Sequence, residues 1–170
     1  MQDLHIAYIS VGSNLGDKLE NCQRGIKALA ETGTSRVLAQ SRVYATEPVD
    51  YEDQDWFINA MVKLETSHDP YDLLDQIESI QRAAGRLKDP IRYGPRILDL
   101  DIILYEDFVI DSERLVIPHP RMHKRRFVLK PICDIDPFII HPVLKKEMQF
   151  LLERLGDEKQ KVFEFKCSNF

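Results

Sequence analysis

The feature of this sequence that most constrains its fold is a pair of aspartates set in an apolar segment. Residues 94–105 read Gly-Pro-Arg-Ile-Leu-Asp-Leu-Asp-Ile-Ile-Leu-Tyr, which predicts a turn followed by a strand. Side chains alternate between the two faces of a strand, so Asp99 and Asp101 share one face. The opposite face is expected to carry the apolar residues Leu98, Leu100, Ile102 and Leu104.

The spacing of these aspartates indicates a cation site. At a rise of about 3.3 Å per residue, the Cα atoms of Asp99 and Asp101 lie roughly 6.6 Å apart. Two carboxylates at that spacing on a stiff strand repel each other unless positive charge lies between them. Carboxylate oxygens with few other protein ligands suit Mg²⁺. A solvated strand face is the alternative interpretation, and the two aspartates alone do not decide between them.

Cationic side chains surround this segment in the sequence. Arg96 leads into the strand, and Arg86, Lys88 and Arg92 lie in the loop before it. An isolated basic loop is usually only solvated, but cations next to paired carboxylates indicate a site for a metal-bound polyphosphate. We therefore expect this loop to lie over a nucleotide.

The composition is that of one soluble globular domain. The 170 residues are enough for a sizeable core, and 44% are hydrophobic and 30% charged. With a formal net charge of −5, the protein does not attract polyanions in bulk, so any phosphate site must be a local cluster. No signal peptide or membrane span is visible. Reduced thiols in a cytoplasm, rather than disulfides or a zinc site, are indicated by three widely spaced cysteines, Cys22, Cys133 and Cys167.

The first part of the chain predicts a strand at residues 4–11, a helix that ends near Glu31 and a second strand at residues 35–44. Between the first strand and the helix, a Gly-Ser-Asn turn offers Ser13 or Asn14 as the helix N-cap. Such a turn can bind phosphate through its amides. Without a GxGxxG motif or a Walker lysine, a purely structural turn is the better interpretation.

Residues 56–65 predict a third strand with one unusual polar position. Phe57 and Asn59 share a face of this strand. An edge-facing amide is a common reason for such an asparagine. The functional interpretation is that Asn59 donates to and accepts from the polar edge of a heterocycle while Phe57 stacks on the ring. A helix follows, with Asp69 as its N-cap and Gly85 at its end.

The chain after the aspartates carries a second cationic cluster. Residues 106–107 predict a tight turn, residues 108–110 a short return strand, and residues 115–120 an extended segment. His119 lies between two prolines; a lone histidine is more often structural, but one beside a metal site can bind phosphate. An amphipathic helix is expected at residues 147–155. The cationic or titratable residues are Arg121, His123, Lys124, Arg125 and Arg126.

Taken in order, these segments resemble one known family, the 6-hydroxymethyl-7,8-dihydropterin pyrophosphokinases of folate biosynthesis. The most specific match is the Gly-Pro-Arg-Ile-Leu-Asp-Leu-Asp-Ile run at residues 94–102. The resemblance covers residues 4–155 of a single domain expected to span residues 1–170, and leaves 156–170 as a tail of unknown role. The other matching segments are residues 11–15, 44–48, 57–60, 85–86, 118–120 and 125–129.

The resemblance implies an α+β, ferredoxin-like fold, in which a mostly antiparallel sheet is flanked by helices in αβα layers. It also implies transfer of the pyrophosphoryl group of ATP to the hydroxymethyl oxygen of the pterin, which leaves AMP. Asp99 and Asp101 would hold two Mg²⁺ ions that bridge the ATP phosphates. ATP would be bound by Arg86, Lys88, Arg96, Ile102, His119 and Arg125. The implied catalytic residues are Arg86, Lys88, Arg96, Asp99 and Asp101.

The same resemblance assigns the pterin site. The pterin ring would stack between Phe57 and Phe127, and Asn59 would bind its polar edge. Further pterin contacts are expected from Thr46, Val49, Tyr93 and Asp99.

Lys88 and Tyr93 depart from the family pattern, in which arginine and tryptophan are common at these positions. Lysine keeps the charge but lacks the planar guanidinium that binds phosphate in a bidentate manner. Tyrosine still covers the pterin, with less area. Neither change removes a metal ligand, so the expected activity is unaltered.

Two other functions stay open as alternatives. A two-metal nucleotidyltransferase also combines a Gly-Ser turn with Asp-x-Asp, but there the two motifs normally lie much closer than Ser13 and Asp99 do here. A ferredoxin-like RNA-binding module fits the order of strands and helices, but the net charge is negative and no aromatic RNP-type strand is present. We therefore expect a cytoplasmic monomer that binds ATP and a reduced pterin, and neither nucleic acid nor a membrane.

Overall fold

The structure is a computed structural model that describes residues 2–49, 51–85, 94–156 and 160–166. The large antiparallel sheet contains β1 (His5–Ser13), β2 (Ser35–Gln40), β3 (Tyr44–Thr46), β4 (Phe57–Thr66), β5 (Asp99–Tyr105) and β8 (Val162–Glu164). A small sheet pairs β6 (Ile110–Asp111) with β7 (Val116–Ile117). The helices are α1 (Lys18–Ala30), α2 (Pro70–Ala83), the 3-10 turn η1 (Met122–Lys124), α3 (Arg126–Ile135) and α4 (Met148–Leu155).

The strands β1 and β4 form the centre of the large sheet. β1 pairs with β5 on one side and with β4 on the other. The second edge of β4 pairs with β2 along one half and with β3 along the other, and β8 adds to the free side of β3. Every pairing is antiparallel. The mostly antiparallel sheet predicted from the sequence is therefore confirmed.

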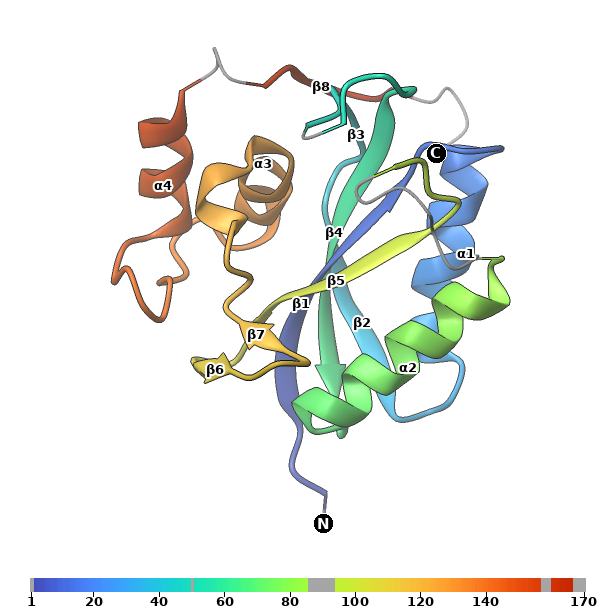
Figure 1. The fold of residues 1–170 in the computed structure, drawn as a ribbon. Coiled ribbons are helices and arrows are strands. Elements are labelled where there is room, and N and C mark those ends of the chain that lie inside the picture. The colour runs from blue at the N-terminus through green and yellow to red at the C-terminus, as the bar shows by residue number, and fades with distance from the viewer. Residues whose placement is uncertain (1, 50, 86–93, 157–159, 167–170) are drawn as a thin grey trace.

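Helices cover both faces of this sheet (Figure 1). α1 and α2 pack on one face, over a core that includes Leu29, Val62 and Ile77. α3 and α4 pack on the other face, over a second core that includes Met61 and Leu129. Met61 and Val62 are neighbours on β4, so the alternation of the strand supplies both cores. The αβα layers of a ferredoxin-like fold are confirmed, and no helix in the described ranges is long and apolar enough to cross a membrane.

The first helix begins later than the sequence pattern indicated. β1 continues through Ser13, and the N-cap of α1 is Asp17, whose carboxylate accepts a hydrogen bond from the Glu20 N–H at 3.1 Å. The prediction of Ser13 or Asn14 as the cap is therefore wrong. Both residues are buried, because the end of β1 lies between β4 and β5 in the sheet.

A β-bulge interrupts β5 at Ile103. Ile102 lies opposite Ile9 and Leu104 lies opposite Tyr8, so Ile103 has no partner in β1. One extra residue reverses the alternation of side chains beyond it. Leu104 thus packs in the core under α3 and α4, and the prediction that it shares a face with Ile102 is wrong.

Other elements also differ from their predicted bounds. The expected strand at 35–44 is divided into β2 and β3, and the return strand expected at 108–110 begins only at Ile110. The helix α3 was not predicted, and it contains Pro131. The tail after residue 156 supplies the edge strand β8.

Candidate active site

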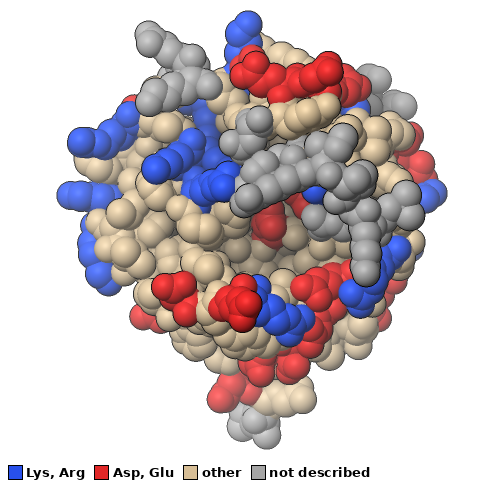
Figure 2. Space-filling view, viewed as in Figure 1, with Lys and Arg blue, Asp and Glu red and all other residues tan. Residues whose placement is uncertain are grey.

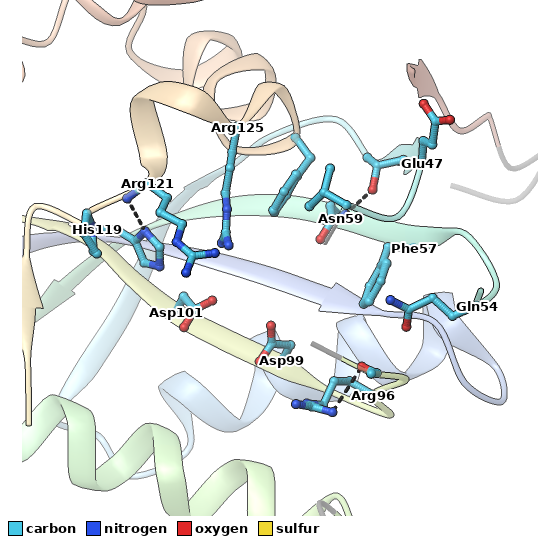
Figure 3. Close-up of a pocket in the computed structure, with 15 residues that line it drawn as sticks. Glu47, Gln54, Phe57, Asn59, Arg96, Asp99, Asp101, His119, Arg121 and Arg125 are labelled. Atoms are coloured by element: carbon cyan, nitrogen blue, oxygen red, sulfur yellow. Dashed lines mark hydrogen bonds between the residues drawn. The ribbon is translucent and has the colours of Figure 1, made fainter. Parts of the chain in front are cut away.

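A cavity of about 430 Å³ opens at one end of the sheet, on the face that carries α3. Its walls come from the β3–β4 connection, from β5 and from the segment between β7 and the start of α3 (Figure 3). Figure 2 shows basic side chains gathered beside a hollow in this face and acidic atoms inside it. The cavity thus combines both signs of charge at one place.

The floor of the cavity is one row of the sheet. Asp99 of β5, Gly12 of β1 and Asn59 of β4 lie side by side in this row. A Cβ added to Gly12 would lie 2.4 Å from Asn59 Oδ1, so the amide fits only beside glycine. A carboxylate and an amide therefore face the same cavity from strands on either side of β1.

Two carboxylates and two guanidinium groups form one end of the cavity. Asp99 and Asp101 point into it from β5, and Arg121 and Arg125 extend toward them from the opposite wall (Figure 3). Within the described ranges, no group of three or more His, Cys, Asp or Glu side chains could hold a metal ion. Mg²⁺ characteristically uses one or two carboxylates and completes its shell with water and substrate phosphates. The donor set of Asp99 and Asp101 therefore fits magnesium that is bound together with a polyphosphate.

His119 is held in one orientation at this end. Its main-chain N–H donates to the Ile103 carbonyl at 2.9 Å, and its ring Nδ1 accepts from the main-chain N–H of Arg121 at 3.2 Å. Burial lowers the pKa of His119 to about 4, helped by Arg125 and Arg121 and opposed by Asp99. At neutral pH the ring is therefore uncharged with its proton on Nε2, where it can donate to an anionic oxygen.

Aromatic and amide groups form the other end. Phe57 from the start of β4 and Phe127 from the start of α3 both line the cavity. Asn59 Nδ2 donates to Thr46 Oγ1 at 2.5 Å, which fixes the orientation of the amide. The Arg125 guanidinium carbon lies 5.4 Å from the centroid of the Phe127 ring. An oriented amide near two aromatic side chains suits a flat polar heterocycle.

Asn14 connects the two loops at the mouth of the cavity. It is 2% exposed, and its Nδ2 donates to Gln54 Oε1 at 2.9 Å and to the Asp55 carbonyl at 3.0 Å. Its Oδ1 accepts from the Arg96 N–H at 2.7 Å. The side chain of this turn residue is thus engaged within the protein, which favours the structural interpretation of the Gly-Ser-Asn turn.

The structure brings most of the residues singled out from the sequence into this one cavity. Ile102 is an exception, because it alternates with Asp101 and its side chain packs in the core under α1 and α2. The Ile102 side chain therefore does not line the cavity, and its expected contact with ATP stays a prediction. Arg86, Lys88 and Tyr93 lie outside the described residues. The predicted residues that line the cavity are Thr46, Val49, Phe57, Asn59, Arg96, Asp99, Asp101, His119, Arg125 and Phe127.

Some lining residues were not assigned a role from the sequence. Arg121 was noted only as part of a cationic cluster, although it lines the cavity beside His119. Glu47 and Gln54 also line it, and they come from an irregular loop without a periodic pattern. Only the tertiary fold shows that these two residues line the same cavity as the paired aspartates.

Comparison with known proteins gives a consistent match. The family model described as 7,8-dihydro-6-hydroxymethylpterin-pyrophosphokinase (HPPK) matches residues 8–137. A Bacillus subtilis protein named 2-amino-4-hydroxy-6-hydroxymethyldihydropteridine pyrophosphokinase is 37% identical over 161 residues, which cover 95% of this chain and 96% of that protein. The folic acid synthesis protein fol1 of Schizosaccharomyces pombe is 43% identical over 153 residues. That match covers 90% of this chain but only 21% of fol1, so the chain corresponds to about a fifth of the longer relative.

Solved structures show the same fold. A crystal structure of Plasmodium falciparum HPPK-DHPS A437G with STZ-DHP superposes with a TM-score of 0.73 at 16% sequence identity. The superposition covers 90% of this chain and 46% of that one. At this level of identity the similarity concerns the fold alone.

Proposed function

This chain belongs to the 7,8-dihydro-6-hydroxymethylpterin-pyrophosphokinase family, and on that premise we propose that it acts in folate biosynthesis as a pyrophosphokinase. It transfers the pyrophosphoryl group of ATP to the hydroxymethyl oxygen of 6-hydroxymethyl-7,8-dihydropterin and yields AMP and the pterin diphosphate. The observation that carries this proposal is the division of one cavity into two ends. Carboxylates with cations suit a metal-bound polyphosphate, and an amide with aromatic rings suits a pterin.

In the reaction, the hydroxymethyl oxygen attacks the β-phosphorus of ATP in line with the departing AMP oxygen. The new O–P bond forms as the bond from the β-phosphorus to the bridging oxygen breaks, and the hydroxyl proton is lost. Asp99 and Asp101 would hold two Mg²⁺ ions, which when bound neutralise phosphate charge and lower the pKa of the attacking hydroxyl. No side chain is then needed as a strong base.

The side chains of the cavity supply positioning. Arg121, Arg125 and the Nε2–H of neutral His119 bind phosphate oxygens from the wall opposite the aspartates. Phe57 and Phe127 hold the pterin ring from its faces. Because Asp99 and Asn59 lie in one row of the floor, the two substrates meet directly above β1.

The proposal also includes three residues that lie outside the described ranges. The contribution of Arg86 and Lys88 to the triphosphate, and of Tyr93 to the pterin, remains part of this proposal. We also propose that the protein is a monomer and that it is located in the cytoplasm. Neither the nucleotidyltransferase nor the RNA-binding alternative is favoured by the family match.

The deciding experiment identifies the nucleotide product. The protein is incubated with ATP, Mg²⁺ and the reduced pterin alcohol, and the products are separated by chromatography. AMP together with a diphosphorylated pterin supports the proposal. Release of inorganic pyrophosphate with a nucleotidylated acceptor would instead establish nucleotidyl transfer, and a reaction mixture without the pterin serves as the control.

A further inference from the structure

The segment that follows α4 lies against the outside of the pterin end of the cavity. Its strand β8 pairs with β3, with Thr46 opposite Val162 (Figure 1). This segment lies beyond residue 137, where the match to the family model ends. Its contacts with the cavity walls are therefore properties of this chain that the family match does not describe.

One side chain of this segment connects two walls of the cavity. Gln160 is 6% exposed. Its Oε1 accepts a hydrogen bond from the Phe127 N–H at 3.2 Å, and its Nε2 donates to the Glu47 carbonyl at 2.9 Å. Phe127 and Glu47 both line the cavity, although they are far apart in the sequence. A single buried side-chain amide thus joins the start of α3 to the β3–β4 connection through two hydrogen bonds.

The start of α3 depends on this contact. The first N–H groups of a helix have no partner within the helix and need an acceptor from outside. The N-cap residue of α3 is Arg125, whose side chain makes no capping hydrogen bond. Phe127 is the second residue of the helix, so Gln160 Oε1 satisfies one of these N–H groups. An acceptor from a distant segment replaces the usual local cap.

The opposite wall is held by the same segment. The Glu47 N–H donates to the Lys161 carbonyl at 2.9 Å, and the Lys161 N–H donates to Glu47 Oε2 at 3.0 Å. Together with the bond from Gln160, these contacts fix both the backbone and the side chain of Glu47. The preceding residue, Thr46, accepts from the amide of Asn59. The position of the Asn59 partner is therefore tied to the C-terminal segment.

We infer that Gln160 is a positioning residue for the pterin, acting through Phe127 and Glu47. The inference rests on the proposed function, because it assigns these walls to the pterin. Asp99 and Asp101 lie on β5, and the main-chain N–H of His119 bonds to Ile103 of that strand, whereas the side chain of Gln160 bonds to Phe127 and Glu47. Loss of the Gln160 amide should therefore affect the pterin much more than ATP.

Two variants separate the two halves of this contact. Gln160→Leu removes both hydrogen bonds at similar volume. Gln160→Glu keeps the acceptor for the Phe127 N–H but loses the donor, and it places a carboxylate against the Glu47 carbonyl. Gln149→Leu is the matched control, because Gln149 is exposed on α4 and its side chain donates to Glu153 Oε1 at 3.1 Å.

The measurement is the affinity for the reduced pterin, by calorimetry in the presence of a non-hydrolysable ATP analogue, together with the KM values of both substrates. We expect Gln160→Leu to weaken pterin binding at least tenfold while the KM for ATP changes less than twofold. Gln160→Glu should weaken pterin binding by an intermediate factor, and Gln149→Leu should leave it unchanged. Equal pterin affinity in the wild type and both Gln160 variants, or equal losses for both substrates, would overturn the inference.

The calorimetric comparison needs no turnover, so it separates this inference from the proposed function. A wild-type protein that binds the pterin but makes no AMP contradicts the proposed reaction, and the affinities still decide the role of Gln160. Hydrogen exchange at the Phe127 amide gives a second readout. Protection that is lost in Gln160→Leu but kept in Gln160→Glu supports the inference, and equal protection in all variants opposes it.

Discussion

Gly12 and Asn59 lie so close together that a methyl group on Gly12 would come within 2.4 Å of Asn59 Oδ1. The two residues are opposite each other in the β1–β4 ladder, and Asp99 lies on the other side of Gly12. The glycine therefore creates the space in which the amide lies between the aspartate and the Thr46 hydroxyl.

Gly12→Ala should displace the Asn59 amide and weaken pterin binding about tenfold or more, since lost amide contacts to a bound heterocycle cost about 1–3 kcal/mol. Calorimetry with the pterin and with an ATP analogue measures the two affinities separately. Gly25→Ala is a suitable control, because its Cβ would lie 2.8 Å from Leu98 Cδ1 on the opposite face of the sheet. Selective loss of pterin affinity in the control as well would contradict this role of Gly12.

Asp101→Ala should reduce turnover by at least about a hundredfold while the protein stays folded, because in the proposed mechanism it loses one of the two carboxylates that would hold the metal ions. Turnover is measured as AMP formation and folding by circular dichroism. Asp111→Ala, an exposed aspartate on β6, is the control. Retention of full activity in Asp101→Ala would refute the metal role.

His119→Asn should flatten the dependence of stability on pH between about 6.5 and 4. In this window the unfolded chain takes up a proton on His119, whereas the folded protein does not, since its pKa is lowered to about 4. The free energy of unfolding therefore falls as the pH falls, by up to about 1.4 kcal/mol per pH unit from this residue. Urea unfolding at several pH values measures the slope. Burial also lowers the pKa of His123 and His141, so part of the slope should remain, but an unchanged slope would exclude His119 as a source.

Phe127→Ala should weaken pterin binding far more than binding of an ATP analogue. Stacking of a flat base on an aromatic ring contributes about 1–3 kcal/mol, which corresponds to roughly 5- to 150-fold in affinity. Phe150→Ala, at a half-exposed phenylalanine of α4, should leave both affinities unchanged. Equal losses for the two ligands in Phe127→Ala would remove the stacking assignment.

Asp136→Ala should lower the free energy of unfolding by about 1–3 kcal/mol, because it leaves the buried Tyr8 hydroxyl without its acceptor. Lys63 Nζ also donates to Asp136 Oδ2, at 2.8 Å. Burial raises the pKa of Asp136, but the hydrogen bonds from Lys63 and Tyr8 outweigh it and lower the pKa overall. The stabilisation should thus be present above about pH 4 and fade in more acidic solution.

The double variant Tyr8→Phe/Asp136→Ala tests the reason for that loss. Removing both partners leaves no unsatisfied buried hydroxyl, so its stability should exceed that of Asp136→Ala in urea unfolding at pH 7. A double variant that is less stable by the sum of both single effects would show that the two residues act independently.

The sequence pattern predicted the structure correctly where local chemistry alone decides it, as in strand alternation and helix capping. The alternation in β4 correctly placed Phe57 and Asn59 on one face of the strand. The start of α2 at Asp69-Pro70 and its end at Gly85 follow from local capping chemistry. The pairing of Asp99 with Asp101 on one face also depends only on the period of a strand.

The remaining features depend on contacts between distant segments, and the pattern missed them for that reason. Ser13 resembles a helix cap in isolation, but pairing with β4 keeps it in β1. At the start of α3, the Phe127 N–H bonds to Gln160, more than thirty positions away in the chain. Glu47, which lines the cavity, likewise bonds to Lys161 of the C-terminal segment.

The bulge in β5 shows how an irregular strand can serve as an anchor. In an uninterrupted ladder each residue would simply lie opposite a neighbour in β1, but Ile103 has none, and its carbonyl receives the N–H of His119. The segment that contains His119 is thereby bonded to β5 two residues from Asp101. The extra residue in β5 thus fixes, through one main-chain hydrogen bond, where His119 lies relative to the two carboxylates.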